Sequence, residues 1–135
     1  MAGHVMAPIA VAELYDKISI IEIKMERIED AGKLANVSAE LDLLSRIAEE
    51  LEGTKDAEVI SLRSQLKTVN EAIWDAENQV RQVAAQDGFG ELFAAVARVT
   101  YSNNDRRAAI KRKLNVVSGS RIIEEKSHSV RPKSA

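Results

Sequence analysis

The sequence predicts an all-α protein, an antiparallel four-helix bundle assembled from helical hairpins with coiled-coil-like seams. Apolar residues recur at alternating spacings of three and four in four successive segments, which matches the period of a helix. Aromatic residues make up only 4% of the chain, prolines number two, and no useful stretch alternates as a strand does. With 135 residues, 45% of them hydrophobic, the chain is long enough to bury the core of one domain.

The first helix is predicted over about residues 10–28, because its apolar residues form a heptad seam. They are Val11, Leu14, Ile18, Ile21, Met25 and Ile28. A second, antiparallel helix is predicted after a short turn at 29–32, and Gly53 is expected to end it in the left-handed conformation. The seam of this second helix consists of Leu34, Val37, Leu41, Leu44, Ala48 and Leu51.

The third helix is predicted to be much longer, about 45 Å at ~1.5 Å per residue. Thr54 and Asp56 are its candidate caps, and a glycine-containing break at 87–90 ends it. Its seam contains Val59, Leu62, Leu66, Val69, Ile73, Ala76, Val80 and Val83. The fourth helix is predicted over about 90–117, followed by a short helical turn over 121–126.

The helices are expected to form one domain over residues 10–127. Residues 1–9 are expected to be disordered. Alternatively, Met6 is the natural start of the protein, and the residues before it were added to it. Residues 128–135 are expected to form a flexible tail.

The composition argues against several classes of site. The chain has no cysteine, which excludes disulfides and thiolate chemistry, and its two histidines, His4 and His128, lie near opposite ends. We therefore expect no metal and no cofactor. No apolar run reaches the ~20 residues of a membrane span, and no secretion signal precedes the first helix. A cytoplasmic protein without a membrane span is expected.

The fourth helix carries polar residues on faces that would normally be apolar. Asn103 shares a face with Leu92, Val96, Val99, Ile110 and Leu114. We interpret Asn103 as a seam residue that fixes helix register and oligomer state; the alternative is that it contacts a ligand. A second stripe, which could line a polar site or an interface, consists of Ala97, Tyr101, Asn104, Ala108, Lys111 and Asn115.

Charges are sorted along the chain, although the formal net charge is only −2. Residues 1–58 hold thirteen acidic and six basic side chains, whereas 98–135 hold three acidic and ten basic ones. One interpretation is that the acidic first half packs beside the basic last helix. The other is an anion-binding face. It would comprise Arg98, Arg106, Arg107, Lys111, Arg112 and Lys113. Nucleic acid is disfavoured, because this helix has only Tyr101 for stacking on bases.

The first helix also has a mixed face, formed by Glu13, Lys17, Ile20, Lys24 and Arg27. Lys17 and Lys24 are expected to be partly buried there, and a buried lysine needs a counter-charge. Asp105, Glu77 or a bound carboxylate or phosphate are the candidates. The residues expected to bind a ligand or partner are Lys17, Lys24, Arg81, Arg98, Tyr101, Asn104, Asp105, Arg107 and Lys111.

Several blocks distributed over nearly the whole chain carry a family resemblance. They are Glu13-Leu14-Tyr15-Asp16-Lys17-Ile18, Ile21-Glu22-Ile23-Lys24, Lys33-Leu34-Ala35-Asn36-Val37, Asn70, Trp74, Glu77, Arg81, Arg98, Tyr101, Asn104-Asp105, Arg107-Ala108, Ile110-Lys111, Asn115 and Glu124-Glu125-Lys126-Ser127. In these blocks the chain resembles an uncharacterised family of short bacterial proteins, a domain of unknown function. The resemblance implies an accessory role near surface-polysaccharide assembly enzymes and implies no activity. His128 departs from the tyrosine usual in that family.

The sequence favours a non-enzymatic interaction module, and an enzyme remains the alternative. No phosphate-binding glycine loop, nucleophile elbow or His-Glu metal motif occurs, and no catalytic residue is proposed. The long third seam exceeds what the first two helices can cover, so we expect a homo-oligomer, a dimer, with a possible protein partner or small anionic ligand. The alternative is a small-anion-binding helical enzyme, with a chorismate-mutase-like site between its helices.

Overall fold

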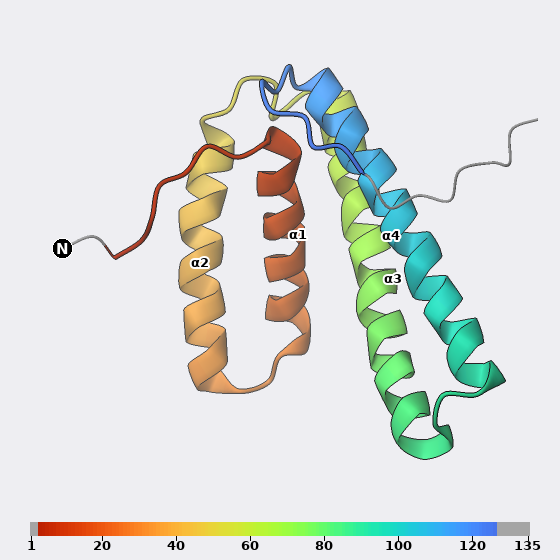
Figure 1. Ribbon diagram of the computed structural model, residues 1–135. Helices are drawn as coiled ribbons and strands as arrows, with labels where there is room; N and C mark the ends of the chain where they lie inside the picture. The colour runs from red at the N-terminus through yellow and green to blue at the C-terminus, as the bar shows by residue number, and fades with distance from the viewer. Residues whose placement is uncertain (1–2, 127–135) are drawn as a thin grey trace, which may run out of the picture.

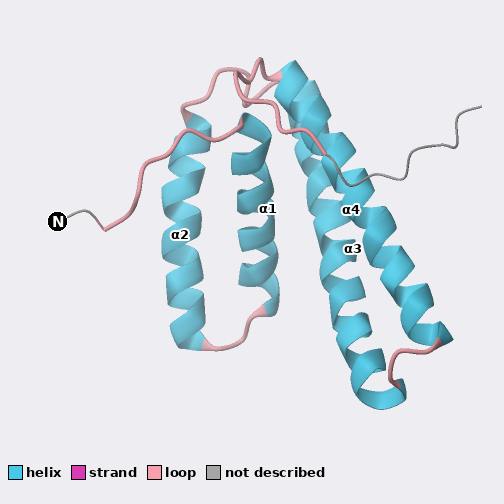
Figure 2. Ribbon diagram, in the orientation of Figure 1, coloured by secondary structure: helices cyan, strands magenta, loops and turns pink. Residues whose placement is uncertain are grey.

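The computed structural model describes residues 3–126 and contains four helices. They are α1 (Val11–Arg27), α2 (Ala31–Glu49), α3 (Ala57–Asp87) and α4 (Glu91–Val117). Within residues 3–126 there is no strand, so the predicted all-α fold with four helices is confirmed (Figure 2). None of the helices in this part of the chain is both long enough and apolar enough to span a membrane.

The helices form two antiparallel hairpins, α1–α2 and α3–α4, which pack against each other through α1 (Figure 1). Helix α1 contacts all three other helices, whereas α2 contacts only α1 among the described helices. Helix α2 is therefore an outer layer, and Ala48 is its one fully buried residue. Because α1 lies between α2 and the α3–α4 hairpin, it has to bury two of its faces.

The main apolar core lies where α1 and α3 begin and where α2 and α4 end. All four helices contribute to it: Ala12, Leu14, Tyr15, Ile18, Ala48, Val59, Leu62, Leu66 and Leu114. At roughly 25 cal/mol per Å² of buried apolar surface, this cluster is the main source of stability at that end of the fold.

Local capping shifts the boundaries of α2 from those predicted. The helix begins at Ala31 because the Asp30 carboxylate accepts a hydrogen bond from the backbone N–H of Lys33 at 2.8 Å. It ends at Glu49, four residues before Gly53. Gly53 has a φ of 78°, so its predicted left-handed conformation is confirmed.

The predicted helical turn over 121–126 is wrong. Gly119, with a φ of 67°, redirects the chain after α4, and residues 121–126 continue without regular secondary structure. We call these six residues the strap. The predicted tail at 128–135, which includes His128, lies outside the described residues, as do residues 1 and 2.

Two residues expected on the buried face of the fourth helix are half exposed. Leu92 has 54% and Val99 51% of its surface accessible, whereas Asn103 is buried as predicted. Helix α3 covers the adjacent side of α4, where Val96 and Thr100 are partly buried, and leaves Leu92 and Val99 at the edge.

The α3–α4 hairpin projects past the end of α1 (Figure 1). Arg27, the last residue of α1, forms an ion pair with Asp75 at 2.6 Å and lies 3.9 Å from Glu71. Its guanidinium is also 5.9 Å from the ring centroid of Trp74, which is half-buried. Beyond these contacts, the distal part of the hairpin has no further helix of this chain against it among the described residues.

Candidate functional site

Polar side chains from three helices meet where α1 packs against the α3–α4 hairpin. We call this set the polar cluster, and it consists of Glu13, Asp16, Ser19, Asn70, Asn104, Arg107 and Lys111. Periodicity places them together. Asp16 and Ser19 share a face of α1, Asn104, Arg107 and Lys111 share a face of α4, and Asn70 lies midway along α3.

Asn70 is the hub of the polar cluster, and only 3% of its surface is exposed. Its amide nitrogen donates to the carboxylate of Asp16 at 2.8 Å and to the hydroxyl of Ser19 at 2.7 Å. Its amide oxygen accepts a hydrogen bond from Arg107 at 3.2 Å. Both ends of the amide are therefore used, which fixes its orientation and the relative position of three helices.

The guanidinium of Arg107 forms its hydrogen bonds with uncharged side-chain amides. Besides its bond to Asn70, it donates to the amide oxygen of Asn104 at 2.8 Å. No carboxylate forms an ion pair with Arg107 within residues 3–126. Its charge is linked to that of Asp16 through the Asn70 amide, which accepts from the cation and donates to the anion.

Lys111 forms the charged contact between α4 and α1. Its ammonium donates to the Glu13 carboxylate at 2.7 Å and lies 3.4 Å from the Asp16 carboxylate, and 18% of its side chain is exposed. Burial acts to lower the pKa of Lys111, but the hydrogen bond from Lys111 to Glu13 and the charges of Asp16 and Glu13 raise it above 10.5. Burial acts to raise the pKa of Glu13, but the bond to Lys111 and the charges of Lys111 and Lys17 lower it below 4.5.

The end of α4 also completes the start of α1. Ala10, at the N-cap position of α1, provides no side-chain acceptor. Instead the amide oxygen of Asn115 accepts from the backbone N–H of Ala12 at 2.8 Å, and the Ser120 hydroxyl accepts from that of Val11 at 3.1 Å. Backbone N–H groups at the start of α1 that no local residue satisfies are thus paired with side chains from more than 100 residues later in the sequence.

The structure brings together three of the nine residues expected to bind a ligand or partner, namely Asn104, Arg107 and Lys111. Tyr101 and Asp105 lie further out, beside the strap. Arg81 and Arg98 are exposed, and Arg81 is 3.9 Å from Glu77 on its own helix.

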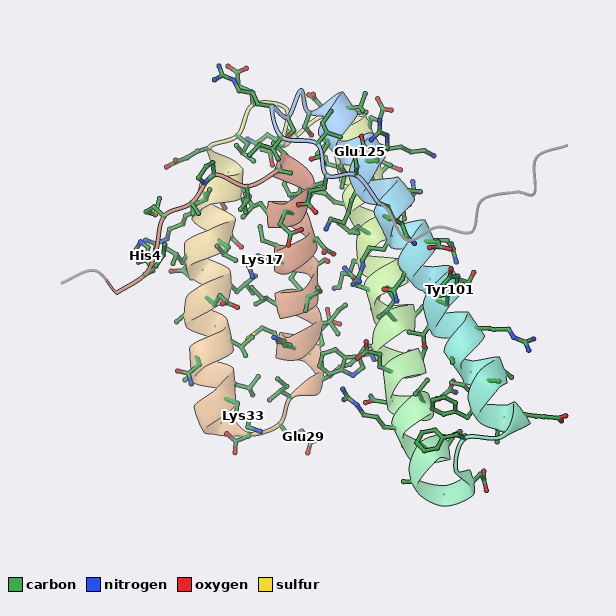
Figure 3. The ribbon with its side chains drawn as sticks, viewed as in Figure 1. His4, Lys17, Glu29, Lys33, Tyr101 and Glu125 are labelled. Atoms are coloured by element: carbon green, nitrogen blue, oxygen red, sulfur yellow. The ribbon has the colours of Figure 1, made fainter. Side chains whose placement is uncertain are left out.

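Two expectations about the lysines are wrong. Lys17, labelled in Figure 3, is exposed, because it lies on the strip of α1 between the two buried faces, whereas Lys24 is half-buried as expected. Neither Asp105 nor Glu77 neutralises a lysine of the first helix or Lys111. Because α4 runs antiparallel to α1, Glu13 and Asp16 are opposite Lys111. These pairs join α1, a helix of the acidic first half of the chain, to the basic α4, as one of the two interpretations of the charge distribution expected. Helix α2, the other helix of that half, does not contact α4 among the described residues.

Sequence reasoning missed Asp16, Ser19 and Asn70 as members of a site. A signal was present in α1, where Ala12, Asp16, Ser19 and Ile23 recur at spacings of four, three and four and are all buried. This second inward-facing line shows that α1 packs on two sides. Asn70 carried a similar signal, because it lies four residues after Leu66 and three before Ile73, and all three are buried. That spacing places Asn70 on the inward side of α3 but does not reveal which residues of other helices it contacts.

The charges within the polar cluster balance one another. Two carboxylates, Glu13 and Asp16, accompany two cations, Arg107 and Lys111. No group of three or more His, Cys, Asp or Glu side chains is placed to hold a metal ion within residues 3–126. The arrangement is suited to fixing how the two hairpins dock, since a satisfied polar network favours one packing over others.

Comparison with known proteins identifies one family. The model of a family of unknown function, DUF6165, matches residues 5–134. No match was found among curated proteins or among solved structures.

Proposed function

The chain belongs to the DUF6165 family, and we propose that it is a non-enzymatic helical interaction module that pairs with a second copy of itself through the distal part of α4. The observation that carries this proposal is an exposed line of Leu92, Ala95 and Val99 on the projecting hairpin. We call this line the distal stripe. Its spacing of three and four is that of a coiled-coil seam.

Among the described residues, no further helix covers the distal stripe. Phe89, at the tip of the same hairpin, is a further exposed apolar residue, with 81% of its surface accessible and its ring edge-on to Phe93 at 5.0 Å. Contiguous apolar surface of this kind marks an interface when it adjoins charged residues.

The charges beside the distal stripe favour a second copy as the occupant. Glu91 and Arg98 are seven residues apart on one side of α4, and neither forms an ion pair within residues 3–126. If two α4 helices pair antiparallel about a point between these residues, Glu91 of each copy faces Arg98 of the other. A two-fold interface requires such self-complementarity.

In this proposal the homodimer is a cytoplasmic scaffold for a protein partner. Its role beside bacterial surface-polysaccharide assembly enzymes rests on the family resemblance noted from the sequence blocks. The alternative, a small-anion enzyme between the helices, has less support, because Glu13 and Asp16 already neutralise Lys111, and Asn70 and Asn104 already bind Arg107.

Charges placed in the distal stripe are expected to separate the copies. Light scattering at micromolar concentration should give twice the 14.8 kDa chain mass for the wild type and one chain mass for Leu92→Lys/Val99→Lys. Val116→Lys is the matched control, since Val116 is exposed at the other end of α4 and should leave the dimer intact. A wild type at one chain mass, or a double variant that stays dimeric, would contradict the proposal.

A further inference from the structure

The strap, residues 121–126, folds back along α4 after the turn at Gly119 (Figure 1). All six of its residues are exposed. Glu125, labelled in Figure 3, lies on the α4 side of the molecule. The strap is therefore a segment laid on the surface of the bundle rather than a part of its core.

Side chains alone hold the strap to α4. Glu125 forms an ion pair with Arg112, and Lys126 forms one with Asp105. The Lys126 ammonium also lies 5.9 Å from the ring centroid of Tyr101. No backbone hydrogen bond joins residues 121–126 to a helix within the described chain. Ile122 and Ile123 keep only 40% of their surface accessible, and the Ile122 carbonyl accepts a hydrogen bond from the Ser120 hydroxyl at 2.7 Å. Exposed ion pairs are weak and salt screens them, so the charged end of the strap, residues 124–126, is held more loosely than its apolar start.

A cavity of about 510 Å³ lies between the strap and α4. Ala108 and Ala109 leave room beside the helix, and Arg112 supplies positive charge, whereas Lys111 is paired with Glu13 and Asp16. On the other side the cavity is lined by Glu124, Glu125 and Lys126 of the strap. The negative charge of Glu124 acts on Lys111, so both strap glutamates face cations of α4.

The charges on the α4 side of this cavity match the order of charges in the strap sequence. Along α4, Arg112 and Asp105 are two turns apart, which is about 10 Å. They bind two successive strap residues, a glutamate and a lysine. A small anion such as phosphate would be attracted by Arg112 but repelled by Asp105, and Lys111 is already paired with Glu13 and Asp16. An extended peptide with an acidic pair followed by a lysine matches the opposite charges of Arg112 and Asp105, as the strap does.

We propose that the α4 side of this cavity, which we call the groove, is a binding site for a peptide segment of a partner protein. That segment contains two acidic residues followed by a basic one. In the unbound chain the strap covers this part of α4 and forms one wall of the cavity, and the partner segment displaces it. The groove lies at the opposite end of α4 from the distal stripe, so this site does not depend on self-association.

The test is fluorescence anisotropy with a labelled peptide, Arg-Ile-Ile-Glu-Glu-Lys, which has the sequence of the strap. The full chain is used in three forms: wild type, the strap variant Glu124→Gln/Glu125→Gln/Lys126→Gln, and the strap variant with Arg112→Gln. The strap variant should bind the peptide about tenfold more tightly than the wild type, because the competing internal segment is removed. Adding Arg112→Gln should abolish that gain.

Matched controls make the result specific. Lys113→Gln, at the exposed neighbour of Arg112, should leave binding by the strap variant unchanged. A peptide with glutamines in place of both glutamates should not bind. Equal binding to the wild type and the strap variant, or none to either, would overturn the proposal. Displacement of the peptide by inorganic phosphate at equal concentration would also overturn it, in favour of a small-anion site.

Discussion

Replacing Asn70 with leucine is expected to lower the free energy of unfolding by about 3 kcal/mol. Leucine fills nearly the same volume as asparagine. It removes the amide nitrogen that donates to the buried Asp16 carboxylate and the amide oxygen that accepts from the Arg107 guanidinium. Both charged groups then lose a partner in a place where water cannot fully replace it. Urea denaturation followed by circular dichroism measures the change.

Asn78→Leu is the matched control for this substitution, because Asn78 is exposed on the same helix. Its effect should lie within about 0.5 kcal/mol of zero. Some buried polar networks can be replaced by apolar residues without loss. If Asn70→Leu were as stable as the wild type, the polar cluster would not determine how the hairpins dock.

Lys111→Met is expected to lower the free energy of unfolding by about 2 kcal/mol, less than for a fully buried pair because the Lys111 side chain is partly exposed. Methionine keeps the apolar contact of the stem but leaves Glu13 and Asp16 without their cation. Lys113→Met, an exposed neighbour on α4, should have little effect. A gain in stability on Lys111→Met, together with a phosphate-dependent rise in the wild-type melting temperature, would instead indicate an anion site.

The same pair makes stability depend on pH in a defined direction. The pKa of Glu13 is lowered from 4.5, so its contribution is present above that value and is lost as the pH falls through the lowered pKa. The pKa of Lys111 is raised from 10.5, so its contribution is present below that value and is lost as the pH rises through the raised pKa. As the pH is lowered from 7 to about 3, the free energy of unfolding should therefore fall less for Lys111→Met than for the wild type. Urea denaturation at a series of pH values measures this difference.

The helices themselves could be predicted from the sequence because their seams are local. Val59 to Val83 on α3 repeat with a period that needs no knowledge of neighbours, and the breaks at Gly53 and Gly88 coincide with positive φ angles. Asn103 could be recognised as unusual because it interrupts an apolar face, and Lys111 because it lies on a stripe that mixes polar and small apolar residues. Periodicity in one helix therefore predicts which face is inward.

Contacts between helices could not be predicted in the same way. The Lys111 pairs with Glu13 and Asp16 depend on which helices are neighbours and on their relative shift along the axes. The exposure of Leu92 and Val99 depends on α1 ending at Arg27, short of the tip of α3–α4. The strap lacks helical structure because Gly119 redirects the chain after α4, and the strap's side chains then pair with α4.

The central claim is that α4 pairs with α4 of a second copy through the distal stripe, and disulfide cross-linking tests it most directly because the chain has no cysteine. Ala95→Cys places a thiol in the distal stripe, near the two-fold axis of an antiparallel pair, whereas Ala39→Cys places one on the exposed surface of α2. Mild oxidation at micromolar concentration, followed by non-reducing electrophoresis, should convert Ala95→Cys to a covalent dimer and leave Ala39→Cys as single chains. Cross-linking of Ala39→Cys but not of Ala95→Cys would contradict the claim.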